Sequence, residues 1–388
     1  MPTMRLVCTF VTVACVHRAV PCQPAATAEA TRSGPVAAAI LEAAFAPTEA
    51  ETYGHVRFLA SAPLGGRSAG SPEGAVAAAY VSAEFAKLGL QPAGPDGTFE
   101  QPFERMTLVA KAGSDREYEK RKVTCRNLMA WLPGSETERT GEFILVGAHY
   151  DHMGRRGETI YFGADDNASG VAGMLSVARA LVEGSIKPRR SVLFAAFDAE
   201  ERGLVGSETM ARKPPRTLHD LVAMINLDMI GRGRLLDRKE MALPKKLIGI
   251  PDGPAVGVLG TKQSPPLAAI ARAVFAAADL PLYAPEDFGM LGSVIEKQAE
   301  GRSDHAPFER RKIPFLFFST SEHDDYHQPT DTMDKVDPAT LHRIAVCVYR
   351  TVLAIDALDE RPVFVGPDAA GEPAVDGADA KQDDKNKK

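Results

Sequence analysis

The sequence has few cysteines, one tryptophan and no cysteine motif of the kind that binds metal. Three of its five cysteines (Cys8, Cys15 and Cys22) lie near the start of the chain, so only Cys125 and Cys347 remain for the rest. Two cysteines cannot form a disulfide framework, although an oxidising compartment would allow one bridge between them. Neither lies in a Cys-x-x-Cys motif or beside a histidine, and buried structural cysteine is the default interpretation.

The sequence also lacks basic stripes, membrane-spanning apolar runs and two common catalytic motifs. Composition is that of a globular protein, with 45% hydrophobic and 25% charged residues and a net charge of -6. Without Lys/Arg stripes and interleaved aromatics, nucleic acid is excluded as a partner. No Gly-x-Ser-x-Gly elbow of a serine hydrolase occurs. The glycine-rich loop Leu64–Ser71 lacks the Gly-Lys-Ser/Thr of a phosphate loop, and we interpret it as a surface turn.

The first 28 residues have the order of a secretory signal. Arg5 precedes the apolar run Leu6–Val16, and a stretch of small residues ends with Ala26-Thr27-Ala28. The apolar run is too short to cross a bilayer. We therefore expect a signal peptide over residues 1–28, a secreted or periplasmic protein, and no stable membrane span; lipid anchoring through Cys22 is disfavoured by the residues before it.

After a mostly helical segment (residues 29–105), strand-like runs alternate with helix-like ones. The run Val192–Phe197 is continuously apolar, as expected for a strand in a sheet that is covered on both faces. The alternation predicts a three-layer α/β/α fold with a mixed, mostly parallel central sheet and helices on both faces. The expected strands are Thr107–Ala110, Val123–Leu132, Phe143–Ala148, Ser191–Phe197, Leu221–Leu227, Ala255–Leu259 and Ile313–Phe318. The expected helices of this part are Gly170–Leu181, Pro266–Ala278 and Pro338–Leu358.

This pattern predicts one domain over residues 29–362. The mixed charges of Gly231–Gly253 indicate a surface excursion. Residues 363–388 are polar and rich in Gly, Pro, Ala and Asp, which predicts a disordered tail.

Histidines and acids follow the ends of several expected strands. In such folds ligands gather at the carboxyl ends of the strands. Any one of these residues could be a solvated loop acid or a helix cap, but jointly they indicate a metal site, and the mixture of imidazole and carboxylate suits zinc better than calcium or magnesium. The residues are His149 with Asp151, the acidic turn Asp165-Asp166, Glu200 with Glu201, Asp228, and His327.

These motifs resemble the dizinc aminopeptidases of metallopeptidase family 28, of the bacterial leucyl aminopeptidase and aminopeptidase Y type, which are related to glutamate carboxypeptidase. The resemblance covers roughly residues 50–360 and implies a zinc exopeptidase-like fold. Its motifs occur in the family's order: His149-Tyr150-Asp151, Gly163–Gly170, Glu200-Glu201, Asn226-Leu227-Asp228 and Tyr326-His327.

The resemblance implies a role for each residue. His149 and Asp228 would bind one zinc ion, Glu201 and His327 the other, and Asp166 would bridge them. Glu200 would be the general base for attack by a hydroxide shared between the metals. Asp151 would orient His149, and Tyr326 would help to stabilise the oxyanion. The loop Ser303-Asp304-His305 would line the site without binding metal.

The function expected from this resemblance is removal of N-terminal residues from peptides or small proteins. A carboxypeptidase, a dipeptidase and a glutaminyl cyclase with one zinc ion remain alternatives on the same scaffold. A receptor ectodomain is disfavoured because every ligand position is filled. Residues 287–301 and 231–253 are expected to set specificity.

Overall fold

The structure is a computed structural model that describes residues 35–110, 118–139, 141–239 and 249–366. The predicted signal peptide lies outside these residues, as do residues 367–388 of the predicted tail. Among the helices described, none combines the length and the apolar character needed to cross a membrane.

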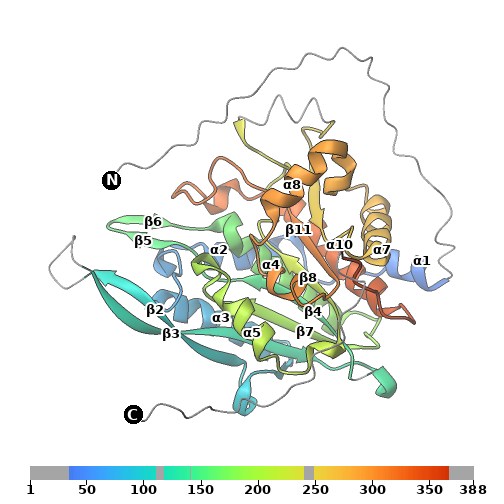
Figure 1. Cartoon of the computed structure of the whole chain (residues 1–388), viewed down its shortest axis with the longest axis horizontal. Helices are drawn as coiled ribbons and strands as arrows, with labels where there is room; N and C mark the ends of the chain where they lie inside the picture. The colour runs from blue at the N-terminus through green and yellow to red at the C-terminus, as the bar shows by residue number, and fades with distance from the viewer. Residues whose placement is uncertain (1–34, 111–117, 140, 240–248, 367–388) are drawn as a thin grey trace, which may run out of the picture.

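A nine-stranded mixed sheet forms the middle layer (Figure 1). Its centre consists of four parallel strands in the order β7 (Ser191–Phe197), β4 (Phe143–His149), β8 (Leu221–Leu227) and β11 (Phe315–Ser319). On one side, the long strand β3 (Tyr118–Leu132) is antiparallel to β7, and to β1 (Gln91–Pro92) and β2 (Glu100–Ala110). On the other side, β9 (Val256–Leu259) is antiparallel to β11 and parallel to β10 (Leu282–Tyr283). The mixed α/β sheet that the sequence predicts is confirmed.

Three of the four central strands, β4, β7 and β8, bury every residue because helices cover both faces of the sheet. On β7, Val192, Phe194 and Ala196 join one hydrophobic core, whereas Leu193 and Phe197 join another on the opposite face. This alternation follows from the two-residue period of a strand. A strand that is apolar on both faces can only be stable between two layers, as the continuous apolar run indicates.

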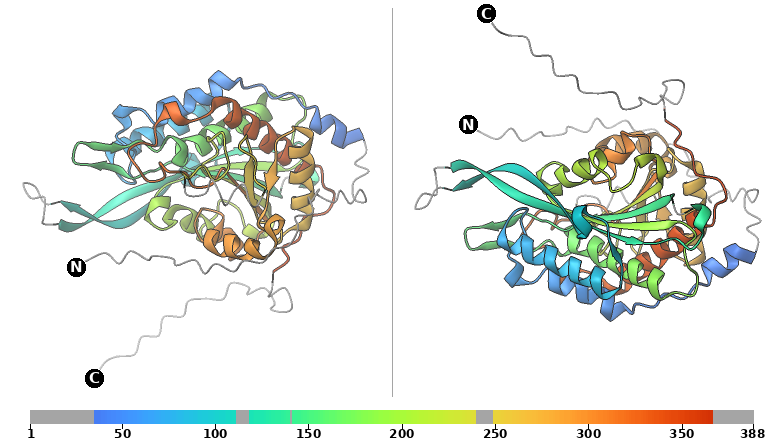
Figure 2. Two further views of the ribbon diagram at one scale, coloured as in Figure 1. Left: turned by 90° about the horizontal axis from the view of Figure 1, so that it is seen from above. Right: turned by 90° about the horizontal axis from the view of Figure 1, so that it is seen from below.

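Figure 2 shows the two helical layers on either side of the sheet. One layer contains α2 (Glu49–Leu59), α3 (Pro72–Lys87), α4 (Gly170–Glu183), α7 (Pro265–Ala277) and α10 (Pro338–Asp356), with α1 (Pro35–Leu41) against α10. The opposite layer includes α5 (Val205–Arg212) and α9 (Ala306–Glu309). The remaining elements described are α8 (Gly292–Ala299) and the hairpin of β5 (Gly154–Arg156) and β6 (Thr159–Tyr161), apart from a π-helical turn (Ala164–Ser169) and short 3₁₀ turns.

Two surface expectations are wrong. Arg67, in the loop expected to be a surface turn, is 0% exposed. The excursion at Gly231–Gly253 is buried in part, because Arg232 is 5% exposed and Leu235 and Ile250 pack in a small core of their own. Cys125 and Cys347 are both buried and free, in separate cores, so they do not pair.

Candidate metal centre

The candidate site lies where the four parallel central strands end. His149 is the last residue of β4, and Asp228 directly follows β8. Glu200 and Glu201 form a short turn after β7, and His327 lies in the loop that follows β11. Because parallel strands have their carboxyl ends at one edge of the sheet, residues far apart in the sequence meet there.

The backbone is in the left-handed region at three of these strand exits. Ala199 (φ 59°) precedes Glu200, Met229 (φ 56°) follows Asp228, and His327 itself has φ 55°. Each non-glycine residue in such a conformation costs roughly 1–3 kcal/mol, and such residues cluster at functional sites.

The turn that carries Asp166 connects β6 to α4 and is anchored by another acid. Both carboxylate oxygens of Asp331 accept hydrogen bonds from the backbone N–H of Asp165, at 3.0 and 3.2 Å, and one accepts from Asp166 at 3.1 Å. Arg232 donates to Asp331 at 2.9 Å. Asp165 accepts from the Gly231 N–H at 2.6 Å, so it is turned away from the site as a backbone anchor.

Asp166 lies between two groups of donor atoms. Its Oδ1 is 3.5 Å from Nε2 of His149, which is 3.3 Å from Oδ1 of Asp228. Its Oδ2 is 3.2 Å from Nε2 of His327, which is 3.1 Å from Oε2 of Glu201. One carboxylate therefore presents one oxygen to each group, as a bridging ligand would.

Further residues hold these donors in place. Ser303 donates to Oδ2 of Asp228 at 2.7 Å and accepts from the amide of Asn226 at 2.7 Å, which leaves Oδ1 of Asp228 for the site. Nδ1 of the fully buried His152 is 2.8 Å from Oε1 of Glu201, so Oε2 of Glu201 faces His327. Supports of this kind fix the orientation of metal ligands in proteins.

Glu200 and Asp151 are connected through the backbone. The Glu200 N–H donates to Oδ1 of Asp151 at 3.0 Å, and a carboxylate oxygen of Glu200 is 3.9 Å from Nε2 of His149. Nδ1 of His149 is 3.2 Å from the carbonyl oxygen of Asp151 and 3.9 Å from its carboxylate. Asp151 therefore faces His149 mainly through its backbone, and its carboxylate positions Glu200.

The charges of the site favour a bound cation. Burial raises the pKa of Glu200 well above its ordinary value, although His149 opposes this. Burial lowers the pKa of His327, but the carboxylates of Asp166 and Glu201 outweigh it and raise that pKa to about 10. Burial likewise opposes protonation of His149, while Glu200 and Asp228 raise its pKa well above the usual range. Several carboxylates close together in a largely buried site are stabilised by a nearby positive charge, such as a bound cation.

The donors fit zinc. Each group offers one imidazole nitrogen and carboxylate oxygens, which are the ligands that zinc takes in catalytic sites. Oδ2 of Asp166 is buried and accepts no hydrogen bond from any described residue. Two sets of three residues have possible ligand atoms within 4.8 Å of one another: His149 with Asp166 and Asp228, and His152 with Asp166 and Glu201.

His152 is a histidine of the site that the sequence did not lead us to expect. It directly follows Asp151 in the run His149-Tyr150-Asp151-His152, so a second histidine three positions after the first was the available signal. Both His152 and His327 approach the pair Asp166 and Glu201, but His152 is 3.8 Å from Asp166, against 3.2 Å for His327.

The other predicted residues are close to the site without contacting both groups. The ring of Tyr326 stacks on that of His327, with centroids 3.9 Å apart. The ring of His305 stacks on those of Phe315 and Phe317, and burial lowers its pKa to about 3, which favours the neutral imidazole. Asp304 is fully buried, and burial raises its pKa to about 7.

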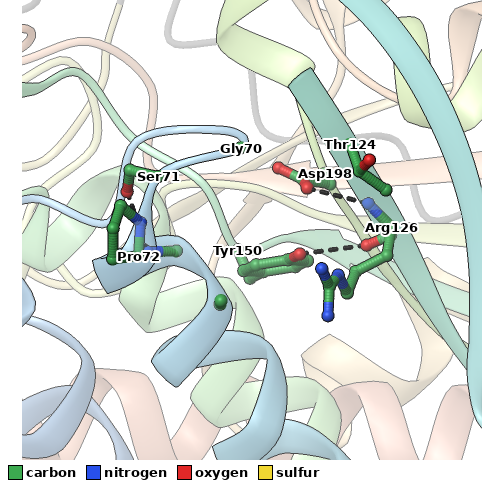
Figure 3. Close-up of a pocket in the computed structure, with 9 residues that line it drawn as sticks. Gly70, Ser71, Pro72, Thr124, Arg126, Tyr150 and Asp198 are labelled. Carbon is green, nitrogen blue, oxygen red and sulfur yellow. Dashed lines mark hydrogen bonds between the residues drawn. The ribbon is translucent and has the colours of Figure 1, made fainter. Parts of the chain in front are cut away.

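A cavity of about 230 Å³ is lined in part by residues that are next in sequence to those of the site (Figure 3). Tyr150 and Asp198 line it together with the start of α3, but no candidate metal ligand does. The hydroxyl of Tyr150 donates to the carbonyl of Arg126 at 3.0 Å, and Asp198 accepts from the Arg126 N–H at 2.9 Å. These bonds attach β3 to the segments that follow β4 and β7, so the cavity belongs to the support of the site.

Comparisons with known sequences agree with this geometry. A family model described as Peptidase family M28 matches residues 127–352, more than half of the chain. A probable zinc metalloprotease of Pyrenophora tritici-repentis is 38% identical over 120 residues, which cover 30% of this chain and 26% of the relative. A probable leucine aminopeptidase of Arthroderma otae is 25% identical over 224 residues, 55% of this chain and 53% of the relative. The chain thus spans between about a quarter and about half of the length of these relatives.

Solved structures share the fold at low identity. An aminopeptidase from Aneurinibacillus sp. strain AM-1 has a TM-score of 0.60 and 19% identity, with 86% of this chain and 97% of that chain covered. A glutaminyl cyclase from Porphyromonas gingivalis has a TM-score of 0.53 and 17% identity, with 79% and 98% covered. At these identities the likeness concerns the fold alone.

Proposed function

The chain belongs to peptidase family M28, and we propose that it is a zinc aminopeptidase that removes N-terminal residues from peptides or small proteins. The observation that carries the proposal is the position of Asp166, with one carboxylate oxygen toward His149 and the other toward His327. This arrangement supports a site for two zinc ions. The relatives named above as a leucine aminopeptidase and a zinc metalloprotease support the class of reaction.

We assign the first zinc ion to His149 and Asp228, the second to Glu201 and His327, and Asp166 to both. His152 then holds Glu201 from behind rather than binding metal, because it contacts the oxygen that His327 does not face. Each ion would have three protein ligands, counting the bridge twice, which leaves positions for water and substrate.

When bound, two zinc ions would activate water near neutral pH and polarise the carbonyl of the bond to be cleaved. Glu200 is the general base: it takes a proton from the attacking water and later gives it to the leaving amine. Its side chain is 11% exposed and lies beside His149, and partial burial raises its pKa well above the usual range, which favours acceptance of a proton. The hydrogen bond from the Glu200 N–H to Asp151 keeps the carboxylate at this place.

Tyr326 completes the proposed site. Its ring packs on the ring of His327 and is partly buried, so the phenol lies next to the second group of donors. Burial raises its pKa, which keeps the phenol protonated and able to donate a hydrogen bond to a developing oxyanion.

The apolar run and small residues near the start of the chain support a secreted or periplasmic enzyme. An oxidising compartment is compatible with the two free cysteines, because both Cys125 and Cys347 are buried.

The test uses purified, zinc-loaded protein with leucine anilide and with N-acetyl-leucine anilide. Cleavage of the free amine, its absence for the acetylated compound, and loss of activity in a chelator are expected. Equal cleavage of both anilides would contradict an aminopeptidase. Release of the last residue from N-blocked peptides would indicate a carboxypeptidase, and ring closure of glutaminyl peptides with one zinc ion would indicate a cyclase.

A further inference from the structure

Arg67 is an arginine buried completely beside the metal centre. It lies in the loop between α2 and α3, outside the segment that matches the family model, and is 0% exposed. No carboxylate of the described residues forms an ion pair with it within 4 Å. An arginine is costly to bury without a partner, so the contacts of its guanidinium need a specific explanation.

All three guanidinium nitrogens of Arg67 donate to backbone carbonyl oxygens. Nε donates to Tyr150 at 2.7 Å. Nη1 donates to Leu59 at 3.1 Å and to Phe162 at 2.6 Å. Nη2 donates to Gly163 at 2.6 Å and, more weakly, to Asp166 at 3.4 Å. These five bonds match the five N–H donors that a guanidinium possesses.

Three of the acceptors, Tyr150, Gly163 and Asp166, belong to segments that carry the proposed ligands. Tyr150 lies directly after His149, and the carbonyls of Gly163 and Asp166 lie in the turn that presents the bridging carboxylate. The backbone of the same loop also pairs with the chain after Asp151: the His152 N–H donates to the Arg67 carbonyl at 3.4 Å. One side chain therefore connects the end of β4 to the Asp166 turn.

Arg67 also supplies a fixed positive charge behind the acids. Burial lowers its pKa to about 10, while Asp166, Asp331 and Asp151 act in the opposite direction. The guanidinium thus stays charged near neutral pH. It offsets repulsion among the carboxylates without occupying the space between Asp166 and the histidines.

We propose that Arg67 is a positioning residue for zinc: its guanidinium fixes the Asp166 turn relative to His149, so that one carboxylate can reach both ions. This inference rests on the proposed function for the identity of the ligands. A purely structural arginine would change stability without changing zinc affinity, and this difference makes the inference testable.

Lysine is the informative substitution at this position. Arg67→Lys keeps the charge, but its three donors are on a single nitrogen. That nitrogen cannot reach all the carbonyl oxygens that surround the planar guanidinium of arginine. The chain offers a matched control in Arg190, which is also 0% exposed. Arg190 donates to Glu142 at 2.6 Å and to the Asp356 carbonyl at 2.6 Å. It directly precedes β7, so it lies at the opposite end of the strands from the site.

Zinc affinity is measured by competition with a chromophoric chelator in the wild type, Arg67→Lys and Arg190→Lys, along with the Tm of the metal-free and zinc-loaded proteins. We expect both variants to lower the Tm of the metal-free protein. Arg67→Lys should weaken zinc binding about 10–100-fold, as for other residues that orient ligands. Arg190→Lys should bind zinc as the wild type does.

Wild-type zinc affinity in folded Arg67→Lys would overturn the inference, as would an equal loss in Arg190→Lys. If Arg67→Lys does not fold, Arg67→Gln, which is neutral, is measured in the same way. Failure of both to fold with or without zinc would assign Arg67 to the fold and also overturn the inference. If the wild type itself binds no zinc, the proposed function fails instead, so the two failures are distinguishable.

Discussion

Replacement of Glu200 by glutamine tests the assignment of the general base. The amide has nearly the shape of the carboxylate but cannot accept a proton at neutral pH. The contact that places this residue is made by its backbone, whose N–H donates to Asp151 at 3.0 Å, so Glu200→Gln leaves that contact intact. The donor atoms of His149, Asp166 and Asp228 also remain unchanged.

The expected loss follows from this separation of roles. A positioned general base contributes about 10²–10⁴ to the rate, so kcat should fall by that factor, which corresponds to about 3–5 kcal/mol in the barrier. KM and zinc content should change little, because Glu200 lies beside the ligands and is not one of them. The thermal stability of the metal-free protein should rise or stay the same, since the substitution removes one buried acid from a crowded group.

The assay measures kcat and KM for leucine anilide and zinc per chain on the same preparation. Glu200→Asp serves as a comparison, because it keeps the carboxylate and withdraws it by one methylene. A Glu200→Gln protein that has lost its zinc would show that Glu200 binds metal, and one with wild-type kcat would show that it is not the base. Either result would refute the assignment.

Three further results are expected. Asp166→Asn should weaken binding of both zinc ions together, because one oxygen faces each group of donors; metal analysis that finds one ion retained at wild-type affinity would contradict the bridge. The carboxylate of Glu208 stabilises the folded protein through its contacts with arginines, above all Arg311, and these contacts lower its pKa to about 2. Because the folded pKa lies below the ordinary value of 4.5, this stabilisation is present above about pH 5 and is lost as the pH falls toward 2. Glu208→Gln should therefore be less stable than the wild type at pH 7, by at most ~1 kcal/mol for such a partly exposed pair, and thermal melts from pH 7 to 2 should show the difference shrinking; a constant difference would be contrary to this reasoning. Phe194→Ala, in the middle of β7, should cost about 3–5 kcal/mol in unfolding free energy by urea titration, and a cost below 1 kcal/mol would mean that the central sheet is packed differently.

The centre of the fold could be predicted from the sequence because burial on both faces leaves a simple pattern. The expected bounds of β7 and β8 are confirmed at both ends, and β4 differs by one residue. Helix α2 lies in the segment expected to be mostly helical, but its bounds were not predicted, because only Thr52, Val56 and Leu59 of its residues are buried and its start depends on a capping box at Thr48. A helix that is stabilised by a narrow stripe of buried residues and by a cap has few regularly spaced apolar residues, so its sequence pattern is weak.

The candidate site likewise has residues that the sequence led us to expect and residues that it did not. Residue type and position indicated a metal site, and the resemblance to the family selected His149, Asp166, Glu201, Asp228 and His327 as its ligands. The structure brings these side chains together; their role as ligands stays a prediction. The arginines that support the site could not be predicted. Arg67 donates to carbonyl oxygens as far as 99 residues away, and backbone acceptors leave no trace in side-chain chemistry. Likewise, the charge of Arg232 indicated a surface position, whereas its partner Asp331 lies 99 residues away.

The most direct measurement is a crystal structure of the zinc-loaded protein with anomalous data collected on both sides of the zinc absorption edge. Two peaks are predicted, one between His149 and Asp228 and one between Glu201 and His327, with Asp166 in contact with both. A single peak, or peaks that Asp166 does not touch, would contradict the two-metal site on which the proposed hydrolysis depends.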